Sequence, residues 1–99
     1  IMQKHTKVYI TFFGFDESDF IPCEICGIKA TDIHHIECRG MGGSETKDNI
    51  ENLQAVCRNC HEKYGDKKQF KQPLKTIHKL KMDIRLKETF GNPDKPLLF

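Results

Sequence analysis

The chain has 99 residues, of which 37% are hydrophobic and 30% are charged, a composition typical of one small globular domain. No apolar run approaches the roughly 20 residues that a membrane-spanning helix needs. The first residues mix lysine and histidine with apolar residues and show no secretory signal. We therefore expect a cytoplasmic protein that does not enter a membrane.

The net charge of +2 is distributed unevenly along the chain. Residues 1–66 carry seven basic and eleven acidic side chains, whereas residues 67–99 carry nine basic and three acidic ones. A basic segment beside an acidic body suits contact with a polyanion. A helix whose lysines only face water would give the same pattern, so the charge alone leaves both interpretations open.

The first half of the chain predicts two strands separated by a turn. Lys7–Phe13 is rich in β-branched and aromatic residues, which predicts a strand. Pro22–Gly27 predicts a tight turn closed by glycine, and Ala30–Glu37 predicts a second, short strand. Arg39–Glu51 is rich in Gly, Ser, Asn and Asp, which predicts a loop.

In the second half, Leu53–Val56 predicts a further short strand. Asn59–Tyr64 predicts a helix that Gly65 ends, and Asp66–Gln72 predicts a basic link. Pro73 is well placed at the start of a helix, and Gly91 and the residues after it would stop that helix near Thr89. Apolar side chains recur there at helical spacing and are expected to pack on the core: Leu74, Ile77, Leu80 and Ile84.

Four of the five cysteines form two Cys-x-x-Cys pairs, Cys23 with Cys26 and Cys57 with Cys60. Without a secretory signal, this arrangement predicts metal binding rather than disulfides. Zinc prefers four such ligands in a tetrahedron, so we expect a structural Zn²⁺ that clamps together the two ends of the strand–loop–strand insert. Cys38 is left over, and we assign it no role.

Several histidines lie inside or beside this clamp. His34 and His35 are on the predicted strand, and His61 directly follows Cys60. Neighbours on a helix point about 100° apart, so if Cys60 faces the zinc, His61 faces away from it and toward the strand pair. Consecutive strand residues face opposite sides, so His34 and His35 can serve one phosphate only if the strand ends or bends there.

This pattern resembles the HNH (ββα-metal, or His-Me finger) endonucleases, which carry a His on the first strand, an Asn before the second and a His on the helix. The matching residues are His35, Asn52 and His61. The cysteine pairs match the subset that carries a structural zinc. The resemblance covers residues 20–65 and implies a small α+β, ββα-metal fold. We expect a single domain over residues 1–99, with a C-terminal amphipathic basic helix at 73–89.

The resemblance also implies roles and a function. His35 would be the general base, and His34 and His61 would hold one divalent cation, Mg²⁺ or Mn²⁺, at the scissile phosphate. Asn52 would hydrogen-bond backbone near His35 and hold that ring in place. Asp32 is a candidate further ligand, because it lies on the same strand face as His34. The products would be 5′-phosphate and 3′-hydroxyl ends of DNA.

DNA is therefore the expected partner. The residues expected to contact its phosphates are Arg39, Lys75, Lys79 and Arg85. His5 and His78 are expected at the surface. The resemblance suggests a phage or prophage enzyme in a bacterial cytoplasm, with packaging or restriction partners, and leaves monomer and dimer open. The alternative is a non-catalytic zinc module that binds nucleic acid or protein, in which the histidines are incidental.

Overall fold

The structure, a computed structural model, describes residues 3–37 and 48–90. Predictions about Cys38, Arg39, most of the loop after it and the stop at Gly91 lie outside these residues. In chain order, the described elements are α1 (Lys4–Phe13), β1 (Asp32–His35), the short 3₁₀ helix η2 (Ile50–Asn52), β2 (Leu53–Val56), α2 (Arg58–Tyr64), the 3₁₀ helix η3 (Lys68–Phe70) and α3 (Lys71–Phe90).

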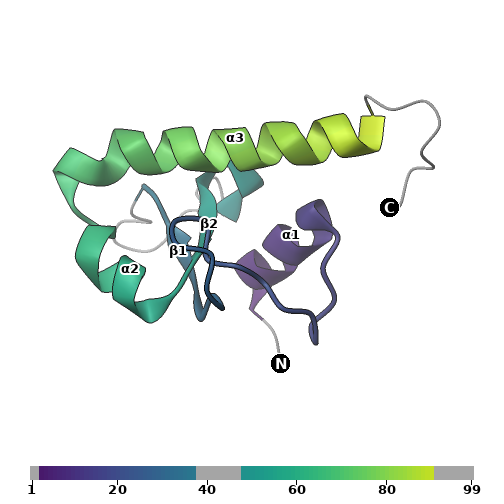
Figure 1. The fold of residues 1–99 in the computed structure, drawn as a ribbon, viewed down its shortest axis with the longest axis horizontal. Helices are drawn as coiled ribbons and strands as arrows, with labels where there is room; N and C mark the ends of the chain where they lie inside the picture. The colour runs from purple at the N-terminus through teal and green to yellow at the C-terminus, as the bar shows by residue number, and fades with distance from the viewer. Residues whose placement is uncertain (1–2, 38–47, 91–99) are drawn as a thin grey trace.

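A two-stranded antiparallel sheet occupies the centre, and the helices surround it (Figure 1). β1 pairs with β2 in a register that sets Asp32 opposite Val56 and His35 opposite Leu53. All four residues of β2 are buried. The predictions of both short strands and of the helix that follows them are confirmed, as is the α+β fold class.

The predicted strand over Lys7–Phe13 is wrong, because these residues belong to α1. β-branched and aromatic residues favour strands only as far as their packing allows. Here Tyr9 and Ile10 are buried against Leu53 and Ala55 of β2, while the exposed residues Lys4, Lys7 and Thr11 recur at helical spacing. Gly14 then ends the helix in a left-handed conformation (φ 77°) that glycine adopts without strain.

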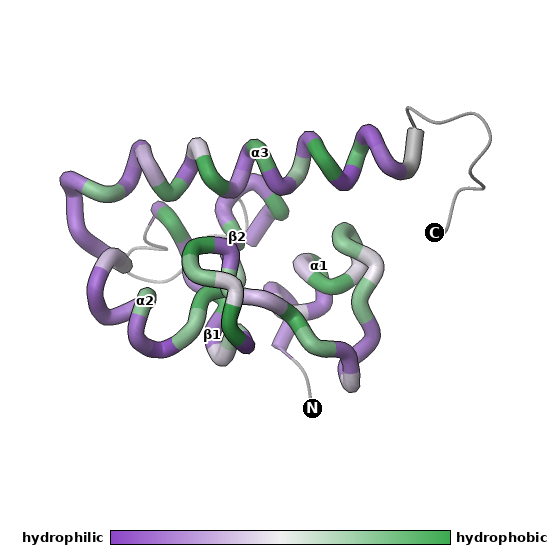
Figure 2. Tube along the Cα trace, in the orientation of Figure 1, coloured by the Kyte–Doolittle hydropathy of each residue, from purple (hydrophilic) through white to green (hydrophobic). Residues whose placement is uncertain are grey.

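α3 is confirmed as a helix, but its contact face differs from the one predicted. Leu74 is buried, whereas Leu80 and Ile84 are 58% and 53% exposed. Hydrophobic positions recur along the whole of α3 (Figure 2). The face of α3 turned toward the core, however, also carries the polar residues His78 and Arg85. The spacing of apolar residues could not predict that these two face inward. No helix in the described part of the chain is long and apolar enough to cross a membrane.

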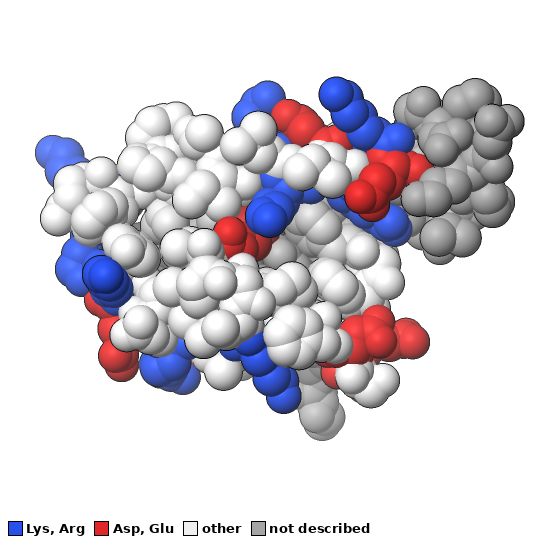
Figure 3. Space-filling model, in the orientation of Figure 1, with Lys and Arg blue, Asp and Glu red and all other residues white. Residues whose placement is uncertain are grey.

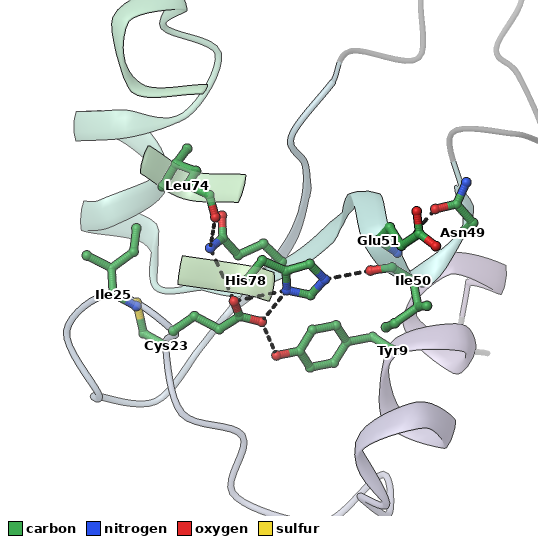
Figure 4. Close-up of polar contacts among 10 residues, drawn as sticks. Tyr9, Cys23, Ile25, Asn49, Ile50, Glu51, Leu74 and His78 are labelled. Carbon is green, nitrogen blue, oxygen red and sulfur yellow. Dashed lines mark hydrogen bonds and ion pairs between the residues drawn. The ribbon is translucent and has the colours of Figure 1, made fainter. Parts of the chain in front are cut away.

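A buried polar network fixes α3 to the rest of the fold, and His78 lies at its centre (Figure 4). The expectation that His78 is a surface residue is wrong, since it is 1% exposed. Its Nδ1 lies 2.9 Å from Glu24 Oε2, and its Nε2 lies 2.6 Å from the Ile50 carbonyl. Glu24 also accepts hydrogen bonds from the Tyr9 hydroxyl at 2.6 Å and from Gln54 at 3.2 Å. Five segments of the chain therefore meet at Glu24 and His78.

The protonation of this network follows from its partners. A carbonyl and a carboxylate only accept hydrogen bonds, so both ring nitrogens of His78 act as donors and the ring is an imidazolium. Burial alone lowers the pKa of His78, but the hydrogen bond and the negative charge of Glu24 outweigh it and raise the pKa. Burial and the charge of Glu24 likewise raise the pKa of the Tyr9 hydroxyl, which keeps it a donor.

Candidate metal centres and active site

The two Cys-x-x-Cys pairs converge on one point. The sulfur atoms of Cys23, Cys26, Cys57 and Cys60 all lie within 4.8 Å of one another. The Sγ atoms of Cys26 and Cys57 are 3.7 Å apart, far longer than the about 2.05 Å of a disulfide. The first pair lies in the turn after Pro22, and the second lies at the start of α2. Together the four thiols form a group that can hold a metal ion.

Backbone amides around the cluster are arranged for sulfur that carries negative charge. The N–H groups of Ile25 and Cys26 point to Cys23 Sγ, and the N–H of Cys60 points to Cys57 Sγ at 3.4 Å. Burial raises the pKa of Cys23, but the amide hydrogen bonds outweigh it and lower the pKa to about 7. Burial raises the pKa of Cys60. Without a cation the four thiols would not all be ionised, so a metal that binds here displaces protons.

A second donor group forms where β1 meets α2. The ligand atoms of His34, His61 and Asp66 lie within 4.8 Å of one another, and the rings of His34 and His61 have centroids 4.7 Å apart. β1 supplies His34, α2 supplies His61, and Asp66 follows the end of α2. The sequence predicted the two histidines together but not Asp66.

His34 is the buried member of this group. It is 4% exposed, and its Nε2 has no hydrogen-bond partner among residues 3–37 and 48–90. Burial, and after it the nearby His61, lower the pKa of His34. The ring is therefore neutral at physiological pH and has a nitrogen lone pair to offer. A buried nitrogen without a partner costs about 1–3 kcal/mol, which a bound cation would offset.

Asp32 orients His61 rather than joining the donor group. Its Oδ2 lies 2.8 Å from His61 Nδ1, and its Oδ1 accepts a hydrogen bond from Arg58 at 3.1 Å. A carboxylate on one ring nitrogen fixes the ring and leaves the other nitrogen, Nε2, for a metal. Asp32, which the sequence suggested as a candidate ligand, thus contacts a member of the donor group but does not belong to the group itself.

His35 lies in a third cluster, with two partners that the sequence did not indicate. Its Nε2 lies 2.7 Å from Asp48 Oδ1, and its ring packs edge-on against His5 at a centroid distance of 5.0 Å. His5, expected at the surface without a partner, is partly buried and packs against His35. No spacing pattern links positions 5, 35 and 48; only the packing of α1 beside β1 brings them together.

Asn52 ties the end of β1 to the start of β2. Its Oδ1 accepts a hydrogen bond from the Glu37 amide at 2.7 Å, and its Nδ2 donates one to the Glu37 carbonyl at 3.0 Å. Ile36 donates its backbone N–H to the Asn52 carbonyl. β1 ends at His35, so these three hydrogen bonds hold the backbone directly after the histidine pair.

Two of the basic residues expected at DNA make contacts within the protein. Lys75 bonds to Glu37, and this hydrogen bond, together with that from Lys71, lowers the pKa of Glu37 to about 2. Arg85 donates from Nε to the Phe12 carbonyl at the end of α1. Lys79 is 78% exposed and, among the described residues, forms an ion pair with Asp83 at 3.5 Å. On the face in Figure 3, basic side chains are spread along α3 among acidic ones rather than gathered in one patch.

The fold is a small α+β domain whose donor groups can hold metal ions. Residues 23–67 match the model of the HNH endonuclease family. This matched segment holds both cysteine pairs, both strands and α2, and the resemblance stated from the sequence is confirmed for it. No curated protein and no solved structure matches the chain in the other two comparisons.

Proposed function

We propose that this protein is a metal-dependent endonuclease that hydrolyses phosphodiester bonds in DNA. The observation that carries the proposal lies within the HNH segment. His34 presents a buried, unpartnered Nε2 toward His61, and the next residue in the chain, His35, is oriented by a carboxylate. Facing imidazoles form a donor set for a divalent cation. A neighbouring imidazole is the commonest general base in enzymes.

The four-cysteine cluster supports a structural Zn²⁺. A tetrahedral ion with Zn–S bonds of about 2.3 Å sets its sulfurs about 3.8 Å apart. The 3.7 Å between the sulfurs of Cys26 and Cys57 fits that spacing. Cys60 is followed directly by His61, so an ion held by the cysteines would also fix the start of α2 and with it the direction of His61.

His34 and His61 would hold the catalytic cation, which we propose is Mg²⁺ or Mn²⁺. When bound, this ion supplies charge stabilisation for the phosphate and for the leaving 3′ oxygen. The neutral ring of His34 offers Nε2, and Asp32 holds Nδ1 of His61 so that its Nε2 points the other way. The protein's part is to place two nitrogen lone pairs at one point before any substrate arrives.

His35 would take the proton from the attacking water. Its contact with Asp48 fixes the tautomer, since a carboxylate accepts only and Nε2 must carry the proton; Nδ1 is then the basic nitrogen. Within β1 the ring of His35 contacts His5 of α1 and the ring of His34 contacts His61 of α2, so the two would approach the phosphate from different faces of the strand. Asn52 holds the backbone directly after His35 through Glu37. In-line attack with a leaving 3′ oxygen gives 5′-phosphate and 3′-hydroxyl ends.

Phosphate contacts from basic side chains would supply binding with little sequence preference. Lys79 is the best placed of the predicted residues that the structure describes, because its side chain is exposed and its contact with Asp83 is long, at 3.5 Å. Lys75 and Arg85 would have to exchange their contacts with Glu37 and Phe12 for phosphates. We therefore propose Lys79 as the main contact among these three.

The test is cleavage of supercoiled plasmid in Mg²⁺ or Mn²⁺ by the zinc-loaded protein and by His35→Ala. We expect nicked or linear DNA from the wild type and a loss of at least about a hundredfold in rate for the variant. Nicks that DNA ligase reseals directly would establish the 5′-phosphate and 3′-hydroxyl ends. Equal cleavage by the two proteins would remove His35 from the mechanism. Salt-sensitive DNA binding without cleavage by the wild type would favour the non-catalytic zinc module.

A further inference from the structure

Gly65 and Asp66 follow α2 directly and lie beside His34 and His61. Gly65 lies one helical turn after His61 and packs against both rings. A Cβ at this position would lie 2.6 Å from Cδ2 of His61 and 3.3 Å from Cε1 of His34. It would also lie 2.5 Å from the His61 carbonyl oxygen. No side chain fits here, so the position one turn after His61 cannot supply a ligand.

Asp66, the next residue, provides the carboxylate that position 65 cannot. Asp66 has a φ of 59°, and it is the one non-glycine residue with a positive φ among the described residues. Asp is among the few residues that adopt this left-handed conformation readily. The turn brings the carboxylate back toward the histidines, with an oxygen within 4.8 Å of the ligand atoms of both. Its negative charge also acts on His34, where it opposes the lowering of the pKa.

We propose that Asp66 is the third protein ligand of the cation held by His34 and His61. The inference rests on the proposed function for the existence of that cation. The independent observation is Nε2 of His34, which is buried, has no partner among the described residues and belongs to the same donor group as the carboxylate. Gly65, which has no side chain, lets the backbone after α2 lie close to both rings.

This ligand set has chemical consequences. Two imidazoles and one carboxylate leave three positions of an octahedral ion for water and phosphate oxygens. The carboxylate lowers the net charge of the site by one and adds a hard oxygen donor. Hard oxygen donors suit Mg²⁺ and Mn²⁺, whereas two imidazoles alone favour softer ions such as Zn²⁺. Asp66 thus makes the site more favourable to Mg²⁺ and Mn²⁺ than two imidazoles alone, and it increases how tightly the site holds the ion.

The experiment is titration of Mn²⁺ into the zinc-loaded full chain, with free Mn²⁺ measured by electron paramagnetic resonance. Asp66→Asn keeps the shape of the side chain and its tolerance of a positive φ but removes the charged oxygen donor. Glu62→Gln is the matched control, because it removes one carboxylate from α2 outside the donor group. We expect the Kd for Mn²⁺ to rise at least about tenfold in Asp66→Asn and to stay within about twofold in Glu62→Gln.

Equal Mn²⁺ affinity in the wild type and Asp66→Asn would overturn this inference while leaving the proposed nuclease intact. Failure of the wild type to bind Mn²⁺ at all would overturn it as well. Asp66-dependent Mn²⁺ binding together with undiminished cleavage by His35→Ala would sustain the ligand and reject the proposed mechanism. A circular dichroism melt of Asp66→Asn that matches the wild type would show that the loss of affinity is not a loss of fold.

Discussion

Two histidines are buried to nearly the same degree in this small protein, and their surroundings differ completely. His78 is 1% exposed, and both of its ring nitrogens have partners, Glu24 and the Ile50 carbonyl (Figure 4). His34 is 4% exposed, and its Nε2 has no partner within the described residues. Burial alone therefore does not separate a histidine that holds the fold from one that is ready to bind a ligand.

Hydrogen-bond satisfaction does separate them. A buried polar group without a partner costs free energy, so a sequence retains one mainly where a ligand completes it. The pKa values move in opposite directions for the same reason. Burial and His61 lower the pKa of His34 and leave a free lone pair, whereas the partner Glu24 raises the pKa of His78 and uses both nitrogens as donors.

Removal of the Zn²⁺ that we propose for the four cysteines should disrupt the surroundings of both histidines and have the largest effect. Cys23 precedes Glu24 and Cys60 precedes His61, so the cluster anchors a partner of each histidine. Structural zinc contributes about 10–16 kcal/mol in small domains, which is comparable to the whole net stability of about 5–15 kcal/mol of a typical domain. We expect a strong chelator to unfold the protein, as measured by far-ultraviolet circular dichroism.

Two cysteine variants serve as controls for the chelator experiment. Cys57→Ser should behave like the chelated wild type even with excess Zn²⁺, whereas Cys38→Ser leaves the four-cysteine cluster intact and should respond to Zn²⁺ as the wild type does. A Cys57→Ser protein that stays folded in the presence of chelator would show that the core suffices without the metal.

His78→Leu should be the next largest change. The substitution removes the cation from a buried carboxylate and leaves Glu24 without its charged partner, which costs about 3–5 kcal/mol. Urea denaturation of the zinc-loaded protein measures the loss. Whatever protein remains folded should bind Mn²⁺ like the wild type, because His78 takes no part in the donor group of His34.

The pH dependence of stability should carry the signature of the same residue. The pKa of His78 is raised in the folded state above the ordinary value of 6.5. The native state therefore holds the proton more tightly, and the contribution is complete below about pH 6.5 and declines as pH rises through the folded-state pKa. Urea melts at intervals from pH 6 to pH 9 should show this decline in the wild type, and subtraction of the His78→Leu series isolates it. Parallel curves for the two proteins would contradict a charged His78.

The features that the sequence predicted correctly depend on residues close together in the chain, and those that it missed depend on contacts between distant segments. The two strands, α2 and the cysteine pairs rest on spacings of a few residues, and all of them lie where the sequence placed them. α1 was missed because its β-branched residues suggested a strand, and only contact with β2 shows that a helical face is buried. The helical spacing of Lys4, Lys7 and Thr11 and the glycine at position 14 were the signals that could have found it.

The contacts that the histidines make with distant segments leave no spacing pattern in the sequence. The inward face of α3 is centred on His78, a polar residue whose burial depends on Glu24, 54 residues away. Asp48 and His5 meet His35 only in three dimensions. Asp66 follows His61 by five residues, which is not a helical spacing, and reaches the donor group only through its left-handed turn.

The smallest change in stability should come from the same substitution at the other histidine. His34→Leu replaces a buried nitrogen that lacks a partner with an apolar group of similar size, so the gain from its removal offsets the lost packing. We expect the free energy of unfolding to change by less than about 1 kcal/mol in urea denaturation without added Mn²⁺. The same variant should lose measurable Mn²⁺ binding and plasmid cleavage. If His34→Leu instead costs as much stability as His78→Leu, then His34 serves the fold, and the contrast between the two histidines fails.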